Sequence, residues 1–210
     1  MRNNGISRAV TKRLPRYYRY LTALKEQGVE RISSKELSEK MKVTASQIRQ
    51  DFSNFGGFGQ QGYGYNVDYL YKEIGKILGL DTERKMVIIG AGRMGQALVY
   101  YQGFSKRGFT LTGIFDKAPS VIGTKVGDFT VQSLDELEQV IKDNDIKIAV
   151  IAVPKLAAQE VADTVCDLGV EGIWNFALVD LKVPSNCVVE NVHLVESLMN
   201  LAYNISVKES

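Results

Sequence analysis

The chain has few of the residues that build metal centres and disulfide frameworks. Its 210 residues include two cysteines, one histidine and four prolines. Cys166 and Cys187 lack the spacing of metal ligands, so we expect no metal site and two reduced thiols, although sequence alone leaves a disulfide open. No apolar run approaches the length of a membrane-spanning helix, and no secretory leader is visible. We therefore expect a cytoplasmic protein that does not enter a membrane.

Acidic residues are scarce at the start of the chain. Residues 1–80 hold 14 basic and 7 acidic side chains, a net charge of +7, whereas residues 81–210 hold 12 and 17, a net charge of −5. A basic segment joined to an acidic one suggests a polyanionic partner for the first segment alone. The composition places a domain boundary near residue 80.

A glycine motif follows directly after an apolar strand pattern in MVIIGAGRMG, residues 86–95. Gly90 permits the turn, Gly92 leaves room for a pyrophosphate, and Gly95 lets the next helix pack closely and point its positive end at the phosphates. The run LTGIFD then ends at Asp116, 21 residues beyond Gly95. At about this spacing a carboxylate binds the adenosine ribose and disfavours a 2′-phosphate, so the motif predicts NAD(H). The alternative for Asp116 is a loop cap.

The segments after residue 80 alternate strand and helix patterns, as a parallel doubly wound α/β sheet requires. Strands are expected at MVIIG, LTGIFD, FTVQ, IKIAVIAV, GIWNF and CVVENV, and helices at MGQALVYYQGFSKRG, LDELEQVIKD and LAAQEVADTVCDLG. A ligand should lie at the carboxyl ends of these strands. Trp174 and Phe176 stand at one such end, where the alternative is that they are core aromatics. The expected cofactor-binding residues are Gly90, Ala91, Gly92, Arg93, Met94, Gly95, Asp116, Lys117, Val153, Pro154, Asn175 and Phe176.

Helical patterns in the first 80 residues predict a helix-turn-helix. We expect a first helix from Pro15 to Gln27, and two short helices opened by the capping boxes Ser33–Glu36 and Thr44–Gln47. The residues expected to face the core are Tyr17, Leu21, Leu24, Leu37, Met41, Ile48, Phe52 and Phe55. The third helix would read DNA, because Arg, Gln and Ser remain on its outer face. A solvated polar face is the alternative.

Two further segments complete the predicted DNA-binding surface. Residues FGQQGYGY look like two short strands with Gln60 to Gly62 at the turn, which would form a wing. Residues 1–13 are either a solvated terminus or a basic arm. A helix at VDYLYKEIGKILG would close the domain. The expected DNA-binding residues are Arg8, Lys12, Arg13, Arg16, Thr44, Ser46, Gln47, Arg49, Gln50, Ser53, Phe58, Gln60, Gln61 and Tyr63.

The last segment, VHLVESLMNLAYNI, is amphipathic. Leu194, Leu198, Leu201 and Ile205 form an apolar stripe at helical spacing. Such a helix can pack on its own domain or insert into a partner subunit, and the sequence does not separate the two.

Taken together, these stretches resemble the Rex family of redox-sensing transcriptional repressors. The likeness rests on LPRYYRYL, GVERISSKEL, SQIRQDFSNFG, FGQQGYGY, ILGLD, the glycine motif, NFA and VENV. It implies a winged helix-turn-helix domain at 1–80, a Rossmann-like domain at 81–192, and a C-terminal helix at 193–210 that is swapped in a homodimer. It also implies NADH and NAD+ as effector ligands, and a palindromic operator in double-stranded DNA that is bound when NADH is scarce.

The resemblance assigns a switch to the subunit interface. By position, Arg19 and Tyr101 correspond to residues that exchange a carboxylate of the partner subunit. His193 stands where that carboxylate is expected, and Leu194 stands where the family often has phenylalanine. Tyr101 and Leu194 are thus expected to contact the cofactor as well. The expected switch and interface residues are Arg19, Tyr101, His193, Leu194, Leu198 and Leu201.

Two other classes of protein compete with this interpretation. One is an NAD-dependent oxidoreductase with an accessory basic domain, and the other is a DNA-binding sensor of another nucleotide, such as a coenzyme A derivative. No proton-transfer constellation stands out, and the single histidine lies on the terminal segment. We therefore expect a regulator without catalytic residues.

Overall fold

The computed structural model describes residues 7–56, 59–60 and 63–209, and the side chains of all of these except Arg8, Gly59, Gln60, Lys208 and Glu209. The chain divides into two compact units, Met1–Thr82 and Glu83–Ser210. Each unit has its own hydrophobic core. Of the expected DNA-binding residues, Phe58 and Gln61 lie outside the described residues.

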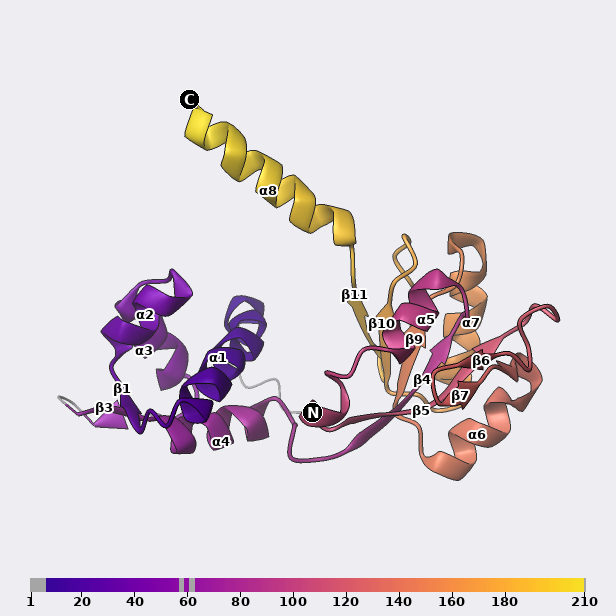
Figure 1. Cartoon of the computed structure of the whole chain (residues 1–210), viewed down its shortest axis with the longest axis horizontal. Coiled ribbons are helices and arrows are strands. Elements are labelled where there is room, and N and C mark those ends of the chain that lie inside the picture. Colours follow the sequence, from indigo (N-terminus) through magenta and orange to yellow (C-terminus); the bar gives the residue numbers. More distant parts are fainter. Residues whose placement is uncertain (1–6, 57–58, 61–62, 210) are drawn as a thin grey trace. The chain divides into compact units, whose positions relative to one another are not determined.

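The first unit joins a group of helices to a small sheet at its edge (Figure 1). Its elements are α1 (Arg8–Glu26), β1 (Arg31–Ile32), α2 (Ser34–Met41), α3 (Ala45–Ser53), β2 (Gly59–Gln60), β3 (Gly64–Asn66) and α4 (Val67–Ile77). Every residue expected to face this core is buried except Phe55, which is partly buried against it. The helical spacing of the apolar residues was therefore a sound guide to packing.

Helix α1 begins seven residues earlier than its sequence pattern predicted. Ser7 is the N-cap, and its side chain accepts a hydrogen bond from the backbone N–H of Val10. Pro15 lies inside the helix, exposed to solvent, although it was expected in the first turn. Val10 and Leu14 are 7% and 2% exposed. They extend the buried stripe of Tyr17 toward the N-terminus, and this packing outweighs the backbone hydrogen bond that proline cannot make.

Helices α2 and α3 form the predicted helix-turn-helix. Ser33 and Glu36 close the first capping box, with the Glu36 carboxylate accepting from Ser33 N at 2.8 Å. Lys42 ends α2 in the left-handed region, at φ 53°, which makes the tight turn into α3. Thr44 caps α3, and its Oγ1 accepts from Gln47 N at 3.1 Å. The amide of Gln47 turns to another partner, so the second box forms only on the Thr44 side.

The small sheet includes a strand that the sequence patterns did not reveal. β3 pairs antiparallel with β2, as the wing prediction required, and also with β1 on its other side. Because β1 has only two residues, it carries no alternation to detect. Gln60 lies within β2, although it was expected at the turn.

The second unit is a doubly wound sheet of six parallel strands in the order β11-β10-β9-β4-β5-β8 (Figure 1). Its larger elements are β4 (Arg84–Ile89), α5 (Arg93–Val99), β5 (Phe109–Asp116), β8 (Gln132–Ser133), α6 (Leu137–Asn144), β9 (Ile148–Ile151), α7 (Lys155–Asp167), β10 (Gly172–Asn175), β11 (Val188–Asn191) and α8 (Leu194–Glu209). This order, three strands on each side of the β4–β9 boundary, is that of a Rossmann sheet, which confirms the predicted fold class.

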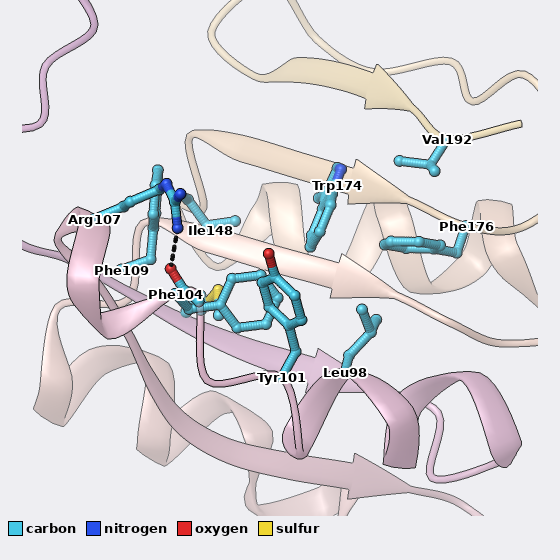
Figure 2. Close-up of a pocket in the computed structure, with 11 residues that line it drawn as sticks. Leu98, Tyr101, Phe104, Arg107, Phe109, Ile148, Trp174, Phe176 and Val192 are labelled. Atoms are coloured by element: carbon cyan, nitrogen blue, oxygen red, sulfur yellow. Dashed lines mark hydrogen bonds between the residues drawn. The ribbon is translucent and has the colours of Figure 1, made fainter. Parts of the chain in front are cut away.

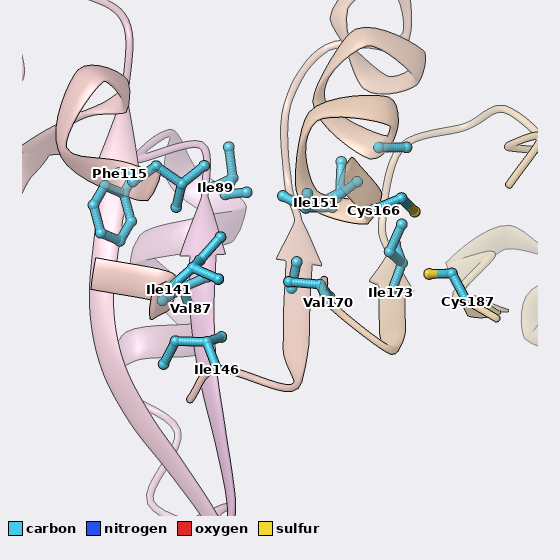
Figure 3. Close-up of a cluster of buried hydrophobic side chains, with 14 of the residues drawn as sticks. Val87, Ile89, Phe115, Ile141, Ile146, Ile151, Cys166, Val170, Ile173 and Cys187 are labelled. Carbon is cyan, nitrogen blue, oxygen red and sulfur yellow. The ribbon is translucent and has the colours of Figure 1, made fainter. Parts of the chain in front are cut away.

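Strand β4 is buried on both faces because its residues alternate between two clusters. Val87 and Ile89 pack with α6 and α7 (Figure 3), whereas Met86 and Ile88 pack toward α5. Cys166 and Cys187 are free thiols in the first cluster. Burial, together with the neighbouring Cys187 thiol, raises the pKa of Cys166 to about 12, so this thiol stays protonated.

Several helices and strands of the second unit have other bounds than the sequence patterns predicted. The helix expected over residues 94–108 stops at Val99 and is followed by a loop and a short 3-10 turn, η1 (Ser105–Arg107). The FTVQ strand is two elements, β7 (Phe129–Thr130), which pairs with the unpredicted β6 (Lys125–Val126), and the edge strand β8. A 3-10 turn, η2 (Leu134–Glu136), precedes α6. The strands among these elements are short segments whose pairing depends on distant residues.

Helix α5 lies against the turn after β4 with no side chain between them. A Cβ on Gly95 would come within 1.8 Å of the Gly90 carbonyl oxygen. Gly90 has φ +106°, and a Cβ there would come within 2.5 Å of the Ala152 carbonyl oxygen. Two of the three motif glycines are therefore fixed by the packing of the protein itself.

We expect Gly95→Ala to lower the free energy of unfolding by about 3 kcal/mol, because the methyl group would push α5 off the β4 turn. Gly92→Ala is the matched variant, since nothing lies within 4 Å of its added Cβ and its φ of −70° suits any residue. Urea titration followed by circular dichroism measures both. Equal stability of the two variants would contradict this account of the packing.

Candidate functional site

The glycine turn borders a cavity of about 710 Å³ at the carboxyl ends of the parallel strands. Nine of the expected cofactor-binding residues line it: Gly90, Gly92, Arg93, Met94, Asp116, Lys117, Val153, Pro154 and Phe176. Ala91 and Gly95 are buried beneath this lining. The expectation that a ligand lies at the carboxyl ends of the strands thus correctly placed residues from four separate segments around one cavity.

Gly92 is the part of the motif that faces open space. It is the N-cap of α5, no side chain caps the helix there, and nothing in the described residues lies within 4 Å of where its Cβ would be. A polar group of a ligand can therefore approach the first turn of α5 closely at this point. The space and the chemistry fit the pyrophosphate that the motif predicts.

Asp116 is bound to the glycine turn itself. Its Oδ2 accepts from the backbone N–H of Ala91 at 2.7 Å, and its Oδ1 accepts from Ala118 N at 2.9 Å. Each carboxylate oxygen can accept a further hydrogen bond. Asp116 is half-buried and lines the cavity, so it can both cap the loop and receive ribose hydroxyls. The two interpretations offered for this residue are compatible.

Asn175, which was expected to bind the cofactor, does not line the cavity at the glycine turn. The residue is 0% exposed. Its Nδ2 donates to Val179 O at 2.8 Å and to Asn191 Oδ1 at 2.9 Å, while its Oδ1 accepts from Ala177 N at 3.0 Å. Both amide protons are used in joining β10 to β11 and to the loop beyond, which makes Asn175 a structural residue.

A second cavity, of about 580 Å³, is lined mainly by apolar side chains (Figure 2). Tyr101, Phe104, Trp174 and Phe176 form a chain of edge-to-face ring contacts, with centroids 4.8, 5.7 and 4.6 Å apart. Phe176 lines both cavities. Trp174 and Phe176 are half-buried, so they are neither pure core residues nor freely exposed.

The residues expected to form the switch are largely exposed in this chain. Tyr101 lines the aromatic cavity rather than the glycine-loop cavity, and is 56% exposed. Leu194, in the first turn of α8, lines neither described cavity. His193 is half-buried, and its backbone carbonyl accepts from Glu196 N at 3.1 Å. On α8, Leu198 and Leu201 are 62% and 54% exposed.

The outer face of α3 carries the side chains expected to read DNA. Ser46, Arg49, Gln50 and Ser53 are exposed. Arg49 donates a hydrogen bond of 3.1 Å to the Oγ of Ser34, which lies at the start of α2. The Ser53 hydroxyl donates to the Gln50 carbonyl at 2.8 Å. These residues lie on one face of a helix in the reading position of a helix-turn-helix.

Gln47 does not belong to this face, contrary to its prediction. It is half-buried, and its Nε2 donates to Asp51 Oδ1 at 2.8 Å. Asp51 is 0% exposed and also binds the guanidinium of Arg13, with Nε–Oδ2 2.7 Å and Nη2–Oδ1 2.8 Å. The Tyr17 hydroxyl donates to Asp51 Oδ2 at 2.7 Å. One buried carboxylate thus joins α1 to α3.

This carboxylate is charged at neutral pH. Burial alone would raise the pKa of Asp51, but the hydrogen bonds from Arg13, Tyr17 and Gln47 outweigh burial and hold that pKa below its usual value. Burial and the bond to Asp51 raise the pKa of Tyr17, which keeps its proton.

The described basic residues of the predicted arm lie on a helix, and Arg2 lies outside the described residues. Arg8 and Lys12 belong to α1, and Lys12 is exposed. Arg16 is half-buried and donates to the carbonyl of Met41, at the end of α2. Arg19 is exposed, with its guanidinium 5.4 Å from the centre of the Tyr20 ring. In the wing, Tyr63 is 71% exposed, and its carbonyl accepts from Arg31.

Sequence reasoning missed three residues of these sites. Asp51 sits four residues after Gln47, a spacing that signals a hydrogen bond on one helix face, but its main partner is on another helix. Phe104 and Arg107 follow α5 in irregular structure, where no periodicity marks them. Within the described part of the chain, no group of three or more His, Cys, Asp or Glu residues could hold a metal. In the same part, no helix is long and apolar enough to cross a membrane.

The fold and these two sites define a class of protein, in which a helix-turn-helix domain is joined to a dinucleotide-binding domain. Two family models match the corresponding parts: a putative DNA-binding protein N-terminus at residues 5–53, and a CoA binding domain at residues 81–179. The chain is 55% identical to the redox-sensing transcriptional repressor Rex of Clostridioides difficile (strain 630), over 96% of each protein. It is 52% identical to the Rex of Caldicellulosiruptor bescii, over 99% of this chain and 95% of that one. The chain belongs to the Rex family.

Solved structures give the same result. The repressor RSP in complex with β-NAD+ and operator DNA superimposes with a TM-score of 0.90 at 52% identity, covering 97% of this chain and 94% of that one. RSP in complex with β-NADH gives a TM-score of 0.89 at 50% identity, covering 97% and 96%. The resemblance inferred from the sequence motifs is confirmed.

We expect Asp51→Asn to lower the free energy of unfolding by about 2 kcal/mol at neutral pH, because a charged acceptor of four hydrogen bonds becomes neutral. The folded-state pKa of Asp51 lies below the ordinary value of 3.8. Its contribution is therefore full above that value and is lost as pH falls through the lower, folded-state pKa. Denaturation at several pH values should show that the free energies of unfolding of the wild type and the variant converge as pH falls below about 4. A difference that stays constant with pH would contradict the assignment.

Proposed function

We propose that this protein is a transcriptional repressor that senses the NADH/NAD+ ratio. It binds a palindromic operator in double-stranded DNA when NADH is scarce and leaves it when NADH rises. NADH and NAD+ act as effector ligands, and the chain works as a homodimer in the cytoplasm. The residues 1–80 serve as the DNA-binding domain, residues 81–192 as the cofactor domain, and residues 193–210 as the dimerisation helix.

One observation carries this proposal. A single chain joins an exposed reading face on α3 to a glycine loop that borders a dinucleotide-sized cavity, and the repressor RSP, with the same fold, has been solved with β-NAD+ plus operator DNA and with β-NADH. The relatives' shared description as repressors favours a regulator over the oxidoreductase alternative.

The exposed helix α8 supports the homodimer. Leu194, Leu198, Leu201 and Ile205 are each about half exposed or more within one chain. A stripe of this kind at the surface of a protein marks an interaction site. A second copy that covers it would also supply the two-fold symmetry that a palindromic operator requires.

Discrimination between the two redox states follows from charge. The oxidised nicotinamide ring is positively charged and the reduced ring is not, so an apolar lining disfavours the oxidised ring. Val153, Pro154 and Phe176 supply such a lining next to the glycine loop. If NADH prefers the DNA-free arrangement of the dimer by about 3 kcal/mol, the balance shifts more than a hundredfold.

A sensor of another nucleotide is the second candidate, since the matched model for residues 81–179 is a CoA binding domain. Asp116 separates the two candidates. Its carboxylate suits free ribose hydroxyls and repels a phosphate group on the adenosine ribose, which coenzyme A and NADPH both carry.

The decisive measurement titrates a protein–DNA complex with NADH, NAD+, NADPH and coenzyme A in parallel. The duplex is selected from a random-sequence pool by the wild-type protein and labelled for fluorescence anisotropy. We expect release by NADH alone. Release by coenzyme A alone would replace the redox proposal with the second candidate.

Gly92→Val should abolish NADH binding and leave DNA binding intact, because the added side chain occupies the open space at the start of α5. Gly172→Ala is the control, since a Cβ there meets only ordinary contacts of 3.9 Å or more at the far end of β10. Calorimetry measures the affinity. Retained NADH binding by the valine variant would refute the role assigned to the loop.

Arg49→Ala should weaken binding of the selected duplex by about 1–3 kcal/mol, because Arg49 is an exposed, base-reading candidate on α3. NADH affinity should not change. Lys72→Ala removes the same charge from α4, where its side chain is 62% exposed and paired with Asp68. If both variants weaken binding equally, net charge rather than a specific contact is responsible.

A further inference from the structure

Asp51 and Arg13 form an ion pair whose two ends lie in different environments. The Asp51 side chain is 0% exposed, while the Arg13 side chain is 25% exposed. The guanidinium therefore extends from a buried carboxylate toward the surface of the first unit. Arg13 lies on α1 and Asp51 on α3, so the pair also fixes the distance between these helices.

The pair leaves part of the guanidinium available. Nε and Nη2 of Arg13 donate to the carboxylate, and Nη1 takes no part in this pair. A planar guanidinium has five N–H donors in a fixed fork, so one edge can hold a carboxylate while Nη1 binds a second acceptor. Because the Asp51 edge is held at 2.7 and 2.8 Å, the direction of Nη1 is fixed in advance.

The carboxylate that holds Arg13 lies beside the exposed face of α3. At 100° per residue, Gln47 and Asp51 occupy the flank of α3 that adjoins Gln50, while Ser46, Arg49 and Ser53 continue the reading face away from that flank. A helix in the major groove has phosphates along its flanks rather than along its centre. The acceptor available at this flank is thus a phosphate oxygen.

We propose that Asp51 is a positioning residue that holds Arg13 so that its Nη1 group binds a DNA phosphate at the edge of the groove read by α3. This inference rests on the proposed DNA-binding function. Tyr17 and Gln47 donate the other two hydrogen bonds that the carboxylate accepts, and they help to hold it in place beneath Arg13.

The test uses a double variant that keeps the net charge constant. Arg13→Gln/Asp51→Asn removes both charges and leaves two amides that can hydrogen bond to each other. The matched control is Lys25→Gln/Asp68→Asn, which removes the exposed ion pair at the other end of α1, with Nζ–Oδ1 2.6 Å. Affinity for the selected duplex is measured from about 50 to 200 mM salt, alongside the melting temperature.

If Arg13 binds a phosphate, the slope of log K against log [salt] should fall by about 0.9 per bound protomer in the first double variant, and should not change in the control. An unchanged slope in a folded protein would overturn the proposal, because it would make the pair purely structural. Should no duplex be enriched from the random pool by the wild type, the DNA-binding function itself would fail instead.

Asp51→Asn alone tests positioning. It leaves Arg13 in place without its anchor and raises the net charge by one, so we expect about tenfold weaker binding of the selected duplex and undiminished binding of a scrambled one. Wild-type affinity for the selected duplex would rule out the positioning role.

If the double variant does not fold, single neutral methylphosphonates placed along the selected duplex replace it. A methylphosphonate at one position should then weaken DNA binding by the wild type more than it weakens DNA binding by Asp51→Asn. The absence of any such position would overturn the proposal.

Discussion

The glycine turn and the cavity of the second unit depend on one close approach of backbone to backbone. The Gly90 carbonyl lies so near Gly95 that a Cβ would overlap it, and the Ala152 carbonyl closes on Gly90 from the next strand. The turn after β4, the start of α5 and the end of β9 therefore meet without side chains between them. The cavity opens at Gly92, where the packing of the described residues does not require glycine and where the proposed cofactor would need the space.

The position of α3 in the first unit depends on a different constraint, a buried charge that needs hydrogen-bond donors. Asp51 cannot remain ionised at 0% exposure without its donors, so Arg13, Tyr17 and Gln47 are held in fixed positions. This removes Gln47 from the exposed face and fixes α3 against α1. In the proposed DNA complex, sequence specificity depends on the few side chains that α3 leaves exposed, and the ion pair beneath them sets the orientation of this helix.

The features that the sequence predicted well depend on residues close together in the chain. Helical spacing located Leu37 and Met41 in the core, and the glycine motif located the turn, because both follow from backbone geometry over a few residues. What it missed is non-local. Arg13 meets Asp51 across 38 residues, and Asn175 meets Asn191 across 16, through the register of β10 with β11. Polar side chains become structural or functional according to such partners, which composition and periodicity do not encode.

The aromatic cavity bears on how a redox signal can be read. Aromatic faces attract cations, so a ring-lined site could favour the oxidised cofactor and oppose the proposed response. Here the rings pack against one another, Phe104 on Trp174 at 86° and Trp174 on Phe176 at 71°. In such edge-to-face contacts the edge of one ring occupies the face of the next. The contact with Trp174 takes up part of the surface of Phe176, which borders both cavities, and so supports the proposed preference for the uncharged, reduced ring.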